Sequence, residues 1–189
     1  HIDDFNGPRR TGVARVDSTV SKGIRQSSAI AYLGRKRPNL ALLTNRQVAR
    51  VRIEDGRAHA IETVSGEVIL ARREIILCQG AFGTPQLLML SGIGPAEHLR
   101  DHGIGPIVNL PGVGENLADH VDVSIQYGSH FAELSHARHQ RLDRAAILMG
   151  RWLMNGSGPG GGSLFSVVLF NAAGDRELPE TQVFMTPMI

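Results

Sequence analysis

The chain has 189 residues and is poor in cysteine and in aromatic side chains. It contains one Cys, one Trp and two Tyr, and aromatic residues make up 5% of the total. A single cysteine excludes a disulfide within the chain and is typical of a reducing compartment, which predicts a cytoplasmic location, with peripheral membrane association as the alternative. The sequence also lacks an apolar run near the ~20 residues of a membrane-spanning helix, so no transmembrane segment is predicted.

An excess of charge of one sign is lacking as well. The chain carries 20 Lys and Arg against 18 Asp and Glu, a formal net charge of +2. Its basic runs, Arg35-Lys36-Arg37 and Arg72-Arg73, are short. Because nucleic-acid binding needs a clustered basic surface, no nucleic-acid partner is predicted. Hydrophobic residues make up 42% of the chain, which is enough for a packed core.

The most informative stretch runs from Cys78 to Gly94. It follows a short apolar run, Glu74 to Leu77, which predicts a buried strand. Thr84 stands at a predicted N-cap, Pro85 at the first helical position, and Ser91-Gly92 at the helix end. A strand, a small-residue turn and a helix start expose backbone N–H groups and a positive helix end. Such a place suits an anionic or polar part of a ligand.

Periodicity and turn residues predict the other elements. Asp55-Gly56 separates two alternating runs and indicates a hairpin. A third run after Ser65-Gly66 extends this hairpin into a β-meander. Helices are predicted at 95–102 and 141–155, with a short one capped by Ser27 or Ser28, and strands at 40–44, 47–54, 58–64, 67–71, 107–108, 122–127, 163–170 and 182–185.

One glycine motif is rejected as a nucleotide site. Residues 156–161 read Gly-Ser-Gly-Pro-Gly-Gly and match G-x-G-x-x-G. The dinucleotide fingerprint follows a strand and opens a helix, whereas this run follows a predicted helix, contains Pro159 and precedes a strand. A loop is the better interpretation.

Histidine and cysteine patterns predict no metal site or nucleophile. His98 and His102 have a spacing compatible with metal binding, but the helix lacks an H-E-x-x-H pattern, so a solvated face is favoured. Cys78 is interpreted as a small core residue. Asp119 and His120 are adjacent, and adjacent side chains rarely face each other, so no catalytic dyad is predicted. A polar stretch also contains His130, His136 and His139, without Cys partners.

Several of these segments resemble one family. Gly80-Ala81, Thr84-Pro85 and Ser91-Gly92-Ile93-Gly94 are similar to the second signature of the glucose–methanol–choline (GMC) oxidoreductases, here at residues 80–94. The similarity extends to most of the chain, more weakly after about Tyr127, and is greatest to the choline dehydrogenase-like branch. Further matching segments are Asp4-Phe5-Asn6-Gly7, Gly23, Arg25, Ser27-Ser28, Tyr32-Leu33, Gly112-Val113-Gly114-Glu115-Asn116-Leu117 and Asp119-His120.

The resemblance implies a fold, a cofactor and a reaction. The expected fold is α/β or mixed α+β, with part of an FAD-binding domain at 1–120, including the β-meander, and part of an antiparallel-sheet substrate-binding domain at 121–189. The implied parent enzyme oxidises a small-molecule alcohol by passing hydride from carbon to the flavin of FAD. Alternatives are a non-redox FAD-containing lyase of the family, or a non-catalytic binding module.

The resemblance also implies three cofactor contacts. A Val after a Leu-x-Thr segment presents its backbone to the adenine in this family, and Val48 after Leu42-Leu43-Thr44 matches it. The N–H and C=O of one residue can pair with neighbouring atoms of a purine edge. Gly80 and Ala81 match the other adenine-side contact, where small side chains allow close approach.

No residue of the chain matches the family's catalytic His or its phosphate-binding loop. The chain is therefore expected to be an internal piece of a longer enzyme and inactive by itself. Choline-active relatives have an acidic residue where the alignment places Ser166, and nothing from Gly160 to Phe170 is acidic. A quaternary ammonium needs an anion or an aromatic cage, so a neutral primary alcohol is the predicted substrate.

Overall fold

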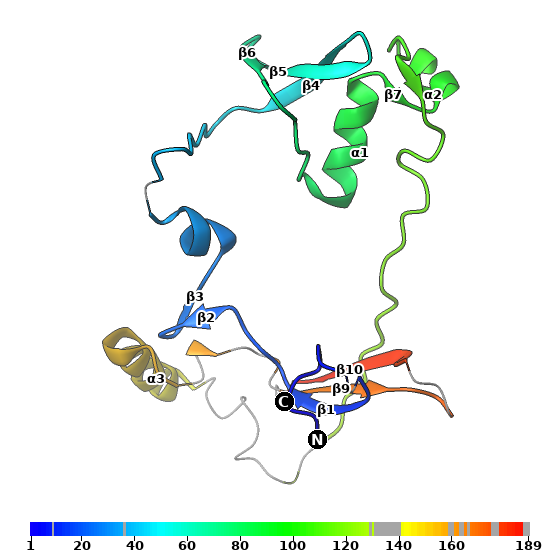
Figure 1. Cartoon of the computed structure of the whole chain (residues 1–189). Coiled ribbons are helices and arrows are strands. Elements are labelled where there is room, and N and C mark those ends of the chain that lie inside the picture. Colours follow the sequence, from blue (N-terminus) through cyan, green and yellow to red (C-terminus); the bar gives the residue numbers. More distant parts are fainter. Residues whose placement is uncertain are drawn as a thin grey trace. The chain divides into compact units, whose positions relative to one another are not determined.

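The computed structural model describes two compact units, each treated by itself below. The central unit comprises Pro38–Val123, and the terminal unit comprises His1–Arg37 with Ser124–Ile189 (Figure 1). The described residues are 1–8, 10–35, 37–128, 130, 141–158, 161–162, 165, 167–174 and 178–186.

The central unit begins with the predicted β-meander. Strands β4 (Val48–Glu54), β5 (Arg57–Thr63) and β6 (Val68–Leu70) form an antiparallel sheet in that order. Asp55 and Gly56, with φ of 49° and 73°, make the turn between β4 and β5. These positive angles are what a two-residue hairpin turn requires, so the predicted hairpin is confirmed.

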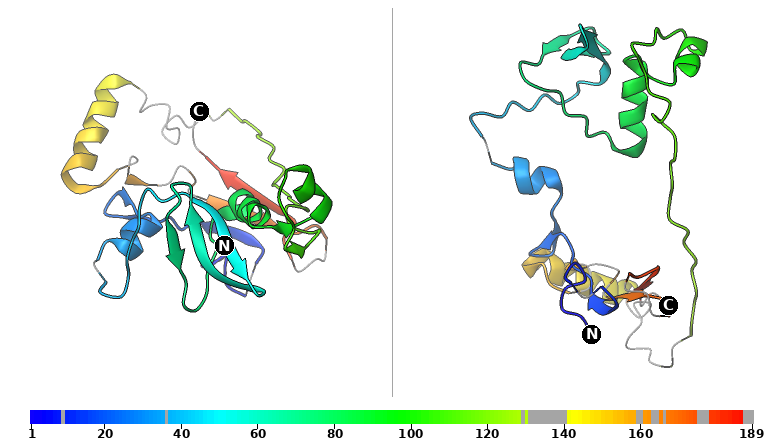
Figure 2. Two further views of the ribbon diagram at one scale, coloured as in Figure 1. Left: turned by 90° about the horizontal axis from the view of Figure 1, so that it is seen from above. Right: turned by 45° about the vertical axis from the view of Figure 1, so that its right-hand side comes forward.

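A helix and a small parallel pair complete this unit. Helix α1 (Gly80–Leu90) packs against β4. The short strands β7 (Ile93–Gly94) and β8 (Val108–Asn109) pair in parallel, and α2 (Ala96–Asp101) belongs to the segment that connects them. Helices α1 and α2 are drawn in green in both views of Figure 2. The buried apolar side chains here are Val51, Ala60, Leu87 and Leu99. Both predicted helices of this unit are therefore present.

The glycines after α1 allow a tight connection. A Cβ on Gly92 would lie 2.8 Å from the carbonyl oxygen of Gly105, and one on Gly94 would lie 2.9 Å from Cγ of Met89. Both distances are shorter than ordinary carbon contacts, so the chain can pass here only without a side chain.

The terminal unit holds a second antiparallel sheet. Strand β9 (Val167–Asn171) lies between β1 (Gly12–Arg15) and β10 (Thr181–Met185). Its core consists of Ile2, Ala14 and Val168, with Phe5, Val16 and Phe170 packed around them.

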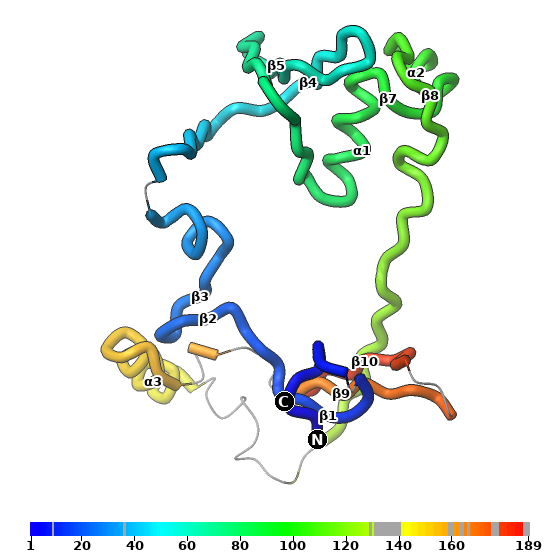
Figure 3. The backbone as a smooth tube through the Cα atoms, viewed as in Figure 1, coloured from blue at the N-terminus to red at the C-terminus, as the bar shows by residue number. Residues whose placement is uncertain are grey.

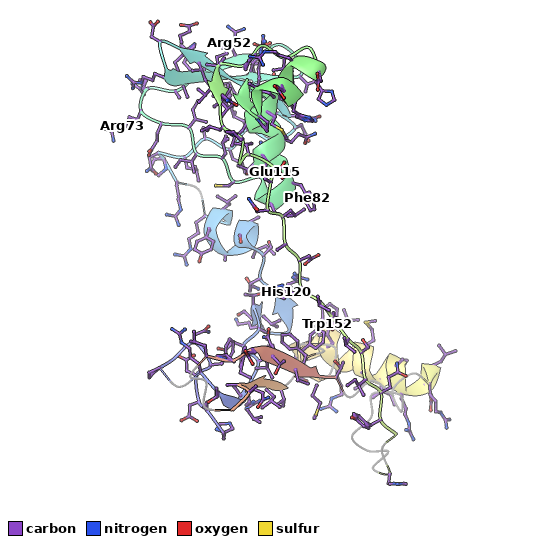
Figure 4. All side chains as sticks on the ribbon, turned by 90° about the vertical axis from the view of Figure 1, so that its right-hand side faces the viewer. Arg52, Arg73, Phe82, Glu115, His120 and Trp152 are labelled. Atoms are coloured by element: carbon purple, nitrogen blue, oxygen red, sulfur yellow. The ribbon has the colours of Figure 1, made fainter. Side chains whose placement is uncertain are left out.

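Three smaller elements belong to the same unit. Strands β2 (Val20–Ser21) and β3 (Ile24–Arg25) form a hairpin, and η1 (Ala29–Leu33) is a short π-helix. Helix α3 (Leu142–Asn155) carries Trp152, whose Nε1–H donates to the carbonyl of Gly23 at 2.7 Å (Figure 4). The mixed α/β class with antiparallel sheets is therefore confirmed.

Three predicted strands are wrong. Residues 40–44, 74–77 and 122–127 are not strands, because no strand in the described part of the chain pairs with them. A strand needs a hydrogen-bonded neighbour as well as an apolar run. Many of their apolar side chains stay exposed, as in Leu42 (63%), Ile76 (74%) and Ile125 (69%), and Ile75 and Leu77 are only half-buried. Cys78, interpreted as a core residue, is exposed for the same reason.

The start of α1 also differs from its prediction. The helix begins at Gly80, a full turn before Thr84, and Pro85 lies inside it. The Thr84 hydroxyl accepts a hydrogen bond from the N–H of Gln79 at 3.2 Å. Pro85 is the sixth residue of the helix, so its missing N–H removes one intrahelical bond, the one that would run to the carbonyl of Ala81.

The compact units of the structure and the domains predicted from the sequence assign the first 37 residues differently. The second break, between Val123 and Ser124, lies near the predicted boundary at residue 120, but His1–Arg37 groups with the terminal unit. The cause is the pairing of β1 with β9. The assignment of 1–120 to an FAD-binding domain and 121–189 to a substrate-binding domain stays a prediction.

Among the described residues, no helix has the length and apolar character needed to cross a membrane.

Candidate cofactor-binding site

Val48 offers its backbone on an open sheet edge. β4 is an edge strand of the three-stranded sheet, and the carbonyl of Gln47 accepts the N–H of Val64 at 2.9 Å. Since successive residues of an antiparallel ladder alternate between facing the partner and facing away, the N–H and C=O of Val48 point away from β5. The Val48 side chain is half-buried, so the part presented at the edge is the peptide backbone.

The same edge is closed a short distance further along by Ser91. The N–H of Val51 donates to Oγ of Ser91 at 2.8 Å, and this hydroxyl donates to the carbonyl of Leu87 at 2.6 Å. A β-bulge between Val48 and Arg50 lets both Val48 and Val51 face the edge, although they are three residues apart. The sequence pattern marked Ser91 only as a helix stop, and this bond to β4 was missed.

Gly80 and Ala81 stand in the first turn of α1. Gly80 has φ of 78°, and a Cβ built on it would meet no atom within 4 Å. Both residues are exposed, and Phe82 beside them is 77% exposed (Figure 4). The first N–H groups of a helix lack intrahelical partners, and the helix dipole is positive there. The turn therefore combines open space with polar donors.

Gly80 and Ala81 lie together at the start of α1, and Val48 lies at the start of β4. α1 meets β4 through Ser91 at its C-terminal end, and its 11 residues make it about 16 Å long. In the backbone trace, one end of α1 lies beside β7 (Figure 3). A ligand that touches both Val48 and Gly80 therefore reaches from the edge of β4 to the first turn of α1. The open edge and the open turn are compatible with FAD there.

A groove lined in part by Ser91 follows β4. It has a volume of about 490 Å³ and runs between Arg50–Glu54, the end of α1 and the 103–107 segment. Glu62 holds the two arginines beside it, with Arg50 Nη2 at 2.9 Å and Arg52 Nη2 at 2.7 Å from its Oε2. Hydrogen bonds from both arginines lower the pKa of Glu62, and the bond from Arg52 has the larger effect. None of the three predicted cofactor residues lines this groove.

The histidine patterns form no catalytic group within the described residues. His98 and His102 contact each other edge to face, with ring centroids 4.6 Å apart, and the described part of the chain has no group of three metal-ligating side chains. The Asp119 carboxylate accepts the backbone N–H of His120 at 2.7 Å, so it does not orient the imidazole. The sequence-based arguments on Pro159, His136, His139 and Ser166 concern positions outside the described residues.

The chain belongs to the glucose–methanol–choline oxidoreductases, because the family profile described as GMC oxidoreductase matches residues 2–122. The family is one of FAD-dependent flavoproteins, as the signature at 80–94 implied.

Three proteins illustrate the similarity. An oxygen-dependent choline dehydrogenase of Brucella ovis is 35% identical over 98% of this chain and 35% of its own length. A formate oxidase variant of Aspergillus oryzae, solved to examine FAD modification, is 32% identical with a TM-score of 0.66, over 84% of this chain and 28% of that one. A fungal aryl-alcohol oxidase has a TM-score of 0.69 and 26% identity, over 86% and 29%. The chain thus spans about a third of the length of these relatives.

Proposed function

We propose that this chain forms the adenine-side part of the FAD site in an alcohol oxidoreductase. Val48 pairs with the adenine edge through its N–H and C=O, and Gly80 and Ala81 let the adenosine part of the cofactor approach the start of α1. The observation that carries this proposal is the outward-facing peptide of Val48 on the open edge of β4.

These residues indicate which role the cofactor has and which role the protein has. FAD supplies the hydride acceptor for alcohol oxidation, and the protein binds and orients it. In this chain the binding groups are backbone atoms, so little depends on side-chain protonation. The small residues at the first turn of α1 keep the approach to its free N–H groups open.

A proline at position 48 tests the adenine contact. The N–H of Val48 points away from the ladder, so Val48→Pro removes that donor and leaves the pairing with β5 in place, as on other edge strands. In the complete protein we expect FAD affinity to fall about tenfold, the effect of one buried hydrogen bond. Titration of the apo-protein with FAD, followed by flavin fluorescence, measures it.

Val48→Ala is the matched control, because it keeps the backbone and shortens only the side chain. We expect it to bind FAD within about twofold of the unchanged protein. A larger loss for Val48→Ala than for Val48→Pro would show that the side chain, not the peptide, contacts the cofactor.

For the substrate we infer a neutral primary alcohol. The relatives named above act, by their names, on choline, formate and aryl alcohols, so family membership leaves the substrate open. Ser166 aligns with the acidic position of choline-active relatives, and no residue from Gly160 to Phe170 is acidic. Without an anion there, a trimethylammonium group loses its principal electrostatic partner.

Steady-state kinetics on the complete enzyme tests this inference. We expect kcat/KM for an uncharged primary alcohol to exceed that for choline by at least about tenfold, the effect of one missing charge contact. We also expect Ser166→Glu to bring kcat/KM for choline closer to kcat/KM for the uncharged alcohol. A higher kcat/KM for choline than for neutral alcohols of similar size would refute the inference.

A further inference from the structure

The Ser91 hydroxyl forms hydrogen bonds to two elements of the candidate site. Ser91 is 5% exposed, and its Oγ accepts from Val51 on β4 while donating to Leu87 in α1. The Val51 N–H faces the sheet edge, where no strand of the described chain pairs with it. The hydroxyl therefore takes the place of a neighbouring strand at this one point.

The backbone around Ser91 prevents the contact from shifting freely. The carbonyl of Gly92 accepts the N–H groups of Ile107 and Val108 at 2.8 and 3.1 Å. A Cβ on Gly92 would collide with Gly105. With the end of α1 fixed on this side, the Ser91 hydroxyl determines where the edge of β4 lies relative to the helix.

We propose that Ser91 is a positioning residue for adenine recognition. Its hydroxyl holds the edge of β4 against the end of α1, so that Val48 and the Gly80 turn keep a fixed position relative to each other for the adenosine part of FAD. The proposal rests on the function proposed above, since it needs the contact at Val48. Ser91 itself touches no part of the cofactor in this arrangement.

A comparison of two flavins separates positioning from general stability. FMN lacks the adenylate part of FAD, so it reports on the rest of the flavin site. We expect Ser91→Ala in the complete apo-protein to weaken FAD about tenfold and FMN less than about twofold, by fluorescence titration. Ser91→Thr retains the hydroxyl, and we expect it to restore most of the FAD affinity.

The outcomes distinguish this proposal from the one it rests on. If Val48→Pro leaves the ratio of FAD to FMN affinity unchanged, the adenine contact itself is wrong. If Val48→Pro lowers that ratio and Ser91→Ala does not, only the positioning role is wrong. Equal losses of FAD and FMN in Ser91→Ala also overturn it, since they indicate a structural role alone. Should Ser91→Ala fail to fold, Ser91→Cys, with similar volume and weaker hydrogen bonding, replaces it.

Discussion

Gly80→Val in the complete protein is expected to abolish most FAD binding. In this structure a Cβ built on Gly80 has no protein atom within 4 Å, so the side chain is added into open space. They occupy the volume through which the cofactor approaches the first turn of α1. Overfilling a close contact costs about 1–3 kcal/mol, or roughly 5- to 150-fold in affinity. The ratio of bound flavin to protein after purification, and titration of the apo-protein, measure the loss.

The conformational strain of Gly80→Val must be separated from its effect on the ligand. Gly80 has φ of 78°, and a side chain in that region costs about 1–2 kcal/mol. Gly66→Val is the matched control, because Gly66 has φ of 85°, equally open surroundings and a place in the same unit. We expect both variants to lose similar stability, and only Gly80→Val to lose FAD. Equal flavin content in the two would remove Gly80 from the site.

The elements that the sequence predicted well are those whose causes are local. The β4–β5 hairpin follows from two alternating runs around Asp55-Gly56, and α2 and α3 follow from their own periodicity and end signals. The strand expected at 74–77 failed for a different reason. Its apolar composition is that of a central strand, but strand structure depends on partners that local sequence does not specify.

In the candidate site as well, the features with local causes could be predicted and those that depend on distant residues could not. The small residues at Gly80 and Ala81 and the helix that follows were readable from turn and helix signals. The open edge at Val48 depends on the β4 bulge, and the Ser91 bond to Val51 joins residues 40 positions apart. Neither the open edge nor the Ser91 bond is indicated by the local sequence. Backbone recognition also places no demand on the side chain at position 48, so only the resemblance pointed to it.

The contact between Gly23 and Gly156 is the second place where a single methyl group is expected to have a large effect. These residues lie in the β2–β3 turn and just after α3, with φ of 72° and 66°. A Cβ on Gly23 would overlap the backbone of Gly156, and one on Gly156 would overlap the carbonyl of Lys22. Backbone atoms cannot rotate away as a side chain can, so the turn and the end of α3 must separate.

Gly23→Ala is therefore expected to destabilise the terminal unit more than positive φ alone explains. We expect about 1–2 kcal/mol from the φ angle and a further ~1–3 kcal/mol from the overlap. Gly174→Ala supplies the control, since Gly174 has φ of 63°, belongs to the same unit and has no atom within 4 Å of its built Cβ. The readout is the thermal unfolding midpoint of the complete protein, together with the rate of proteolytic cleavage near α3.

Trp152→Phe isolates the hydrogen bond at the same contact. It removes the Nε1–H that donates to Gly23 and keeps most of the ring, so we expect a loss of about 0.5–1.5 kcal/mol. The expected order of destabilisation is Gly23→Ala first, with Gly174→Ala and Trp152→Phe both smaller. If Gly23→Ala and Gly174→Ala shift the midpoint equally, the two glycines are not in backbone contact. In that case the bond from Trp152 is the main contact between α3 and the β2–β3 hairpin in the described part of the chain, and Trp152→Phe should then give the largest increase in cleavage near α3.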